Sequence, residues 1–89
     1  MKIPKKVKIS GRVYQIEFQK ETDIIANDCG KNSRIKGLIA IDADLMQSEK
    51  ELTFFHEIIH LLNGEIEEVE CEWLATAMYA FLKDNNLLK

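Results

Sequence analysis

The residues with the clearest capacity for chemistry lie in the segment 56–60, His-Glu-Ile-Ile-His, which holds both histidines of the chain. In a helix, residues four apart lie on one face, so His56 and His60 can present two imidazole nitrogens to one metal ion. Glu57 projects about 100° round the helix from His56, where it can reach a water on that metal. The pattern therefore predicts a zinc (Zn²⁺) site in which Glu57 activates the bound water for attack on a peptide carbonyl.

The apolar surroundings of this segment strengthen the interpretation. From Thr53 to Leu62 the only acidic or basic residue besides the histidines is Glu57. Ionisable groups in such a stretch are costly to bury unless they have partners, and a metal ion is one such partner. A purely structural alternative, in which the histidines are hydrogen-bonded core residues, has to explain why both of them lie one turn apart beside a glutamate.

A third metal ligand is expected from the acidic segment that follows Gly64. A catalytic zinc site usually has three protein ligands and one open position, and the chain has no third histidine. The inward face of the second predicted helix, projected back from Cys71 and Ala75, reaches Glu68, which we take as the third ligand. The other candidates are Glu65, Glu67, Glu70 and Glu72. Acidic residues also collect at helix N-termini because of the helix dipole, so most of this cluster needs no metal.

The composition limits the other classes of function. The 89 residues are expected to form one domain, 1–89, because a second core has no room. A net charge of −3 weighs against nucleic acid as the main partner, which would favour a clustered basic surface. No stretch approaches the roughly 18 apolar residues of a membrane span, and no export signal is apparent. We therefore expect a cytoplasmic protein with free thiols at Cys29 and Cys71, and the sequence leaves its oligomeric state open.

Strands are expected in the first half of the chain and helices in the second. Apolar positions alternate on both sides of Ser10-Gly11, which predicts a β-hairpin, and residues 35–42 predict a third strand with Ile39 and Ile41 on one face. Residues 27–32 between them are typical of a loop. Strands followed by helices predict an α+β fold: a small N-terminal antiparallel sheet of about three strands, then two long helices, the first carrying the His-Glu-x-x-His segment.

The boundaries of the two helices also have sequence signals. Ser48 and Glu51 match a capping box, so the first helix is expected to begin at Ser48 and to end near Leu62, before Asn63-Gly64. The second is expected from about Glu67 to Asn85. Its inward stripe is expected to consist of Cys71, Leu74, Ala75, Met78 and Leu82.

Residues 35–86 resemble small zincin-like metallopeptidases of phages and mobile elements, which are similar to the peptidase domain of the ImmA/IrrE family. The likeness is carried by residues 37–42 (Gly-Leu-Ile-Ala-Ile-Asp), by the His-Glu-Ile-Ile-His segment, and by Glu68, Leu74-Ala75 and residues 78–85. The usual Glu-Ala-Asn-x-Phe-Ala pattern of the second helix is replaced here by Glu-Cys-Glu-Trp-Leu-Ala. The resemblance implies a zincin-like fold with two histidine ligands, a glutamate acid/base and a downstream glutamate ligand.

The functional prediction is a zinc metallopeptidase that hydrolyses peptide bonds of a cytoplasmic protein partner. The resemblance implies that this partner is a phage or mobile-element repressor. The main alternative is a non-catalytic, zinc-stabilised binding or regulatory module such as an antirepressor, and a third is a metal-free structural protein. Tyr14, Arg34 and Tyr79 are candidates for stabilising the oxyanion, and the sequence favours none of them.

Overall fold

The alternating residues around Ser10-Gly11 form a hairpin in the computed structural model, which describes residues 1–23 and 37–88. Strands β1 (Lys6–Ile9) and β2 (Arg12–Gln19) pair antiparallel, with Ile9 opposite Arg12. Ser10 and Gly11 have φ values of 52° and 82°. Positive φ at both central residues is the geometry of a two-residue turn whose twist matches that of the strands. The predicted hairpin is therefore confirmed.

The third strand, β3 (Leu38–Asp42), pairs with β2 in parallel, in the sheet order β1-β2-β3. The predicted sheet was antiparallel throughout, and this part of the prediction is wrong. A parallel pair needs a long crossover, which residues 20–37 supply, beginning with a helical turn at residues 21–23. Ile39 and Ile41 lie on one face of β3, as predicted, and both are fully buried. The alternation of side chains along a strand is the same whether the strand runs parallel or antiparallel. The predicted loop 27–32 and the first two residues of the predicted strand lie outside the described residues.

Helix α3 (Gln47–Leu62) carries the His-Glu-x-x-His segment, but its first turn differs from the expected one. The N-cap is Met46, with no capping side chain, and Lys50 N donates to Met46 O, so Ser48 already lies inside the helix. Glu51 does not reach back to the helix start. It is buried, and its Oε1 accepts hydrogen bonds from the Met1 amine and the Tyr79 hydroxyl at 3.4 Å and 3.2 Å. The capping-box prediction is therefore wrong, because the Glu51 carboxylate pairs with the Met1 amine and the Tyr79 hydroxyl and not with the start of the helix.

Helix α4 (Glu68–Asp84) packs against α3 through part of its predicted stripe. Cys71 and Ala75 are fully buried, whereas Leu74 and Met78 are 41% and 50% exposed. The inward face therefore continues from Ala75 to the half-buried Tyr79, whose ring lies 6.0 Å from that of Phe55 on α3. Because α4 is apolar on most of its circumference, its periodicity does not identify the buried side uniquely.

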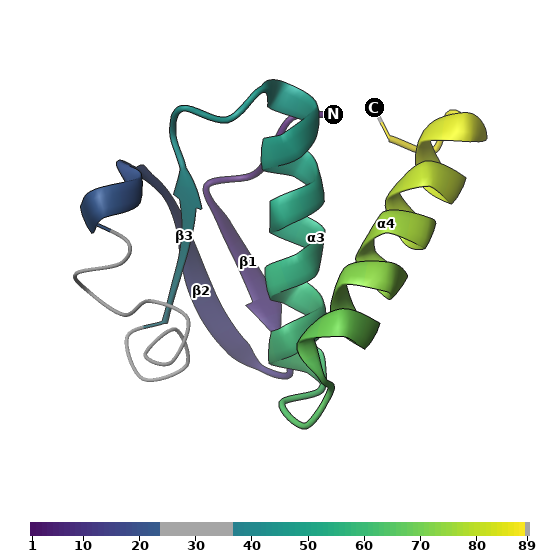
Figure 1. The fold of residues 1–89 in the computed structure, drawn as a ribbon. Helices are drawn as coiled ribbons and strands as arrows, with labels where there is room; N and C mark the ends of the chain where they lie inside the picture. The colour runs from purple at the N-terminus through teal and green to yellow at the C-terminus, as the bar shows by residue number, and fades with distance from the viewer. Residues whose placement is uncertain (24–36, 89) are drawn as a thin grey trace.

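The elements form three layers, with α3 between the sheet and α4 (Figure 1). The core lies between the sheet and α3 and comprises Ile9, Tyr14, Ile16, Ile39, Ile41 and Phe54. The predicted α+β order, a three-stranded sheet followed by two long helices, is confirmed for the described residues. None of the helices in this part of the chain is long and apolar enough to cross a membrane.

Candidate metal site

The turn between the helices places the end of α3 against the start of α4. Asn63 organises this turn: its N–H donates to Ile59 O at 2.9 Å, and its side-chain Oδ1 accepts from Glu65 N at 3.1 Å. His60 lies in the last turn of α3, and Glu68 is the first residue of α4. The short link therefore brings an acidic helix start beside the histidine face of α3.

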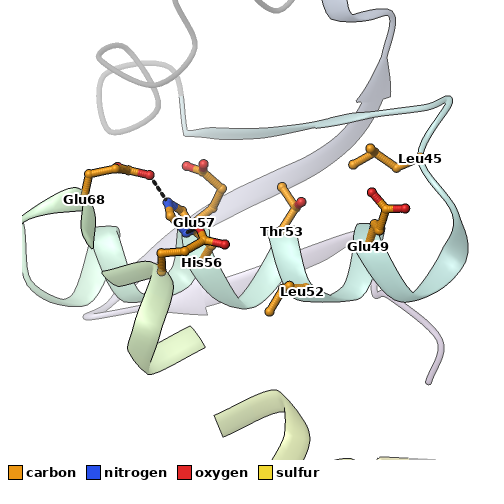
Figure 2. Close-up of a pocket in the computed structure, with 8 residues that line it drawn as sticks. Leu45, Glu49, Leu52, Thr53, His56, Glu57 and Glu68 are labelled. Atoms are coloured by element: carbon orange, nitrogen blue, oxygen red, sulfur yellow. Dashed lines mark ion pairs between the residues drawn. The ribbon is translucent and has the colours of Figure 1, made fainter. Parts of the chain in front are cut away.

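A cavity of about 350 Å³ lies over these residues. In Figure 2, His56, Glu57 and Glu68 gather at one end of it, and Leu45 and Glu49 lie at the other. Its size is typical of a small ligand site. It is lined by Leu45, Glu49, Leu52, Thr53, His56, Glu57, Glu68 and Glu72.

The side chains of His56, His60 and Glu68 converge on one point. The two Nε2 atoms are 3.1 Å apart, and the Glu68 carboxylate spans them, with Oε1 2.7 Å from His56 Nε2 and Oε2 2.8 Å from His60 Nε2. Ligand atoms of a tetrahedral zinc ion stand about 3.3 Å apart, given Zn–N distances of about 2.0–2.1 Å. The Glu68 side chain is 71% exposed, so a small rotation can open its contacts to that spacing. The residues present are thus close enough to bind a metal, and they fit zinc.

Glu72 contacts the opposite edge of the His56 ring. Its Oε2 lies 3.0 Å from His56 Nδ1, and the His56 side chain is only 12% exposed. With a metal ion at Nε2, Glu72 would accept the proton of Nδ1, and the Nε2 lone pair would be free to bind the metal beside His60 and Glu68. Metal-binding histidines usually have such a carboxylate or carbonyl partner, which fixes both ring orientation and tautomer. Glu72 is therefore better suited to orient His56 than to be the third ligand.

Glu57 lines the same cavity beside His56. Burial raises the pKa of its carboxyl group, the positive charges of His56 and His60 lower it, and the nearby Glu68 raises it again. Burial is the largest of these effects, so Glu57 holds a proton more readily than a carboxyl group in water. A raised pKa is the direction that suits a carboxyl group which accepts and returns a proton.

Cys71 offers a second group of metal-binding atoms together with His56 and His60. Its thiol is fully buried between the helices and donates to the backbone oxygen of His56 at 3.2 Å. Burial raises the pKa of the Cys71 thiol, and the charges of Glu68, Glu57 and Glu72 raise it further. Since a metal binds the thiolate, this environment favours the ligand set with Glu68.

The other sequence candidates are placed elsewhere or fall outside the described residues. Tyr14 is a core residue with 5% exposure, and the Tyr79 hydroxyl donates to Glu51, so neither faces the cavity as an oxyanion donor. Arg34 and Cys29 lie outside the described residues. The remaining glutamates considered as third ligand do not line the cavity, namely Glu65, Glu67 and Glu70.

The role of Glu72 was missed, although a signal for it exists. Glu68 and Glu72 have the same i, i+4 spacing as His56 and His60, so two matched pairs face each other across the helix interface.

No known protein family, curated protein or solved structure matches this chain.

Proposed function

We propose that this protein is a zinc-dependent metallopeptidase of the zincin type, related to the ImmA/IrrE peptidases, which cleaves a protein partner in the cytoplasm. The observation that carries the proposal is the convergence of His56, His60 and Glu68, whose facing atoms lie 2.7–3.1 Å apart beside the half-buried Glu57. Two histidines and one glutamate form a ligand set of catalytic zinc sites, with the fourth position left for water. A repressor of a phage or mobile element is the substrate that the resemblance suggests.

The residues of the chain have distinct tasks in this proposal. His56, His60 and Glu68 would hold the zinc ion, and Glu72 would keep the His56 ring in the required orientation. When bound, zinc supplies Lewis-acid chemistry, lowering the pKa of a water and polarising the peptide carbonyl. Glu57 takes one proton from the attacking water and returns it to the leaving amine, so the peptide bond is exchanged for a carboxyl and an amine with no net loss of protons.

The edge of the sheet gives a peptide a place to lie. Gly37 O accepts a hydrogen bond from Gln15 N, and Ala43 N donates one to Gln19 O. The backbone N–H and C=O groups of the odd-numbered residues of β3 therefore point toward β2. The backbone groups of Leu38, Ala40 and Asp42 therefore point to the opposite side, at the edge of the described sheet. β3 also packs against α3, the helix that carries the metal site. An extended substrate can add to this edge through main-chain hydrogen bonds, as in other cases of strand addition.

The activity can be tested without knowing the natural substrate. Zinc-loaded wild-type protein and its Glu57→Gln variant would each be incubated with a peptide mixture from digested cell extract, and new amino termini counted by mass spectrometry. We expect new termini with the wild type and none with Glu57→Gln at equal zinc content. Zinc-loaded wild type that gives no more new termini than Glu57→Gln would refute the peptidase and favour the non-catalytic binding module.

A further inference from the structure

An apolar cavity adjoins the candidate metal site on the outer side of α4. It has a volume of about 490 Å³ and is lined by Glu68, Val69, Glu72, Trp73 and Thr76. Glu68 and Glu72 also line the cavity that contains His56 and Glu57. The two cavities therefore share a wall, and a ligand bound in one of them can extend into the other.

The apolar residues of this second cavity are largely exposed in the part of the chain that the structure describes. Val69 and Trp73 are 79% and 70% exposed, whereas Cys71 and Ala75 on the same helix are fully buried. An indole exposed to this degree leaves on the order of 100 Å² of apolar surface in water. Covering that surface with an apolar side chain of a ligand would remove it from water at no cost to the fold.

Among the described residues that line the two cavities, the charged side chains besides His56 are all glutamates. Between Lys50 and Lys83 the sequence contains no lysine or arginine, while five glutamates lie within residues 65–72. A surface with one sign of charge attracts ligands of the opposite sign and repels those of its own. Charge complementarity therefore selects a basic ligand.

We propose that Val69, Trp73 and Thr76 form a subsite for one large apolar side chain of the substrate, in a peptide segment whose neighbouring residues are basic. This inference rests on the proposed function, because the metal site would hold a main-chain carbonyl of the same peptide. Glu68 and Trp73 are about 7.5 Å apart along the helix axis. An extended peptide advances about 3.3 Å per residue, so the apolar residue lies about two residues from the bond that is cleaved.

Trp73 is the only tryptophan in the chain, so its fluorescence reports on this cavity alone. The full-length Glu57→Gln variant, loaded with zinc, would be titrated with capped glycine-serine peptides that contain a central Lys-Leu-Lys, Lys-Ala-Lys or Glu-Leu-Glu. We expect a saturable blue shift with Lys-Leu-Lys, and at least about tenfold weaker binding of the other two. Equal binding of all three peptides, or no saturable shift with any of them, would overturn the subsite.

Two matched variants test whether the peptide binds in the cavity or to other exposed apolar residues of α4. Val69→Asn should weaken binding of the Lys-Leu-Lys peptide by about tenfold, with zinc content and melting temperature unchanged, since Val69 is exposed. Phe81→Asn changes another exposed apolar residue of α4 that does not line the cavity, and it should bind normally. Equal affinities of the two variants would contradict the proposal.

The outcomes for the subsite and for the peptidase can be told apart. If the Lys-Leu-Lys peptide bound at Trp73 but the wild type cleaved no peptide, the subsite would stand and the proposed activity would be refuted. Cleavage by the wild type, with cut sites that show no preference for a nearby large apolar residue, would remove the subsite alone.

Discussion

Replacing Glu72 with alanine tests how α4 supports the metal site. The change removes the acceptor 3.0 Å from His56 Nδ1, so the ring loses the contact that directs its Nε2 toward the metal. Carboxylate partners of this kind typically change metal affinity about 10- to 100-fold. The Glu72 side chain is 61% exposed, so solvent screens the contact. We therefore expect the lower limit, a loss of about tenfold, which corresponds to about 1.4 kcal/mol.

The assay is competition for zinc against a chromophoric chelator of known affinity. Glu72→Gln keeps a neutral acceptor and should recover part of the lost affinity, which separates hydrogen bonding from simple charge. Glu70→Ala removes the same charge from α4 at a residue outside the cavity lining, and it should bind zinc within about twofold of the wild type. If Glu72→Ala and Glu70→Ala bound zinc equally well, the orienting role of Glu72 would be refuted.

The remaining predictions concern stability and the choice of ligands. Zinc at about 100 times its dissociation constant should stabilise the fold by about 2.7 kcal/mol and raise the melting temperature by roughly 10–20 °C. Identical melting temperatures for the metal-free and the zinc-loaded protein would show that the folded state has no such site. Cys71→Ala should keep a full complement of zinc by elemental analysis, because the thiol contacts a backbone oxygen, and loss of zinc would make Cys71 a ligand. Tyr79→Phe removes one of two donors to the buried Glu51 and should cost about 1 kcal/mol, seen as a midpoint lower by about 4–8 °C; an unchanged midpoint would show that the contact contributes nothing.

The position of the metal-site residues could be predicted because helical geometry fixes it. His56 and His60 must share a face of any helix, and Glu68 could be reached by projecting the buried face of α4 back from Cys71 and Ala75. The contact between Glu72 and His56 Nδ1 was not predicted, because it depends on how closely α4 approaches α3. Spacing within one helix specifies which residues share a face, but not the distance to the next helix.

The errors in the fold prediction have a related cause. Alternation in β3 places Ile39 and Ile41 inward whether the strand runs parallel or antiparallel, so strand direction depends on the connection and not on the pattern. Ser48 and Glu51 have the spacing of a capping box, but Glu51 pairs instead with the partly buried amine of Met1 and with the Tyr79 hydroxyl, which are distant in sequence. Local signals identified the strand and the helix. The direction of the strand and the partners of Glu51 depended on parts of the chain that are distant in sequence.

Anomalous diffraction at the zinc edge, from crystals of zinc-loaded protein, tests the central claim most directly. We expect one peak within about 2.0–2.2 Å of His56 Nε2, His60 Nε2 and a carboxylate oxygen of Glu68, with the Cys71 sulfur outside the coordination shell. A peak bound to Cys71 in place of Glu68, or no peak between the two histidines, would contradict the metal site on which the proposed peptidase depends.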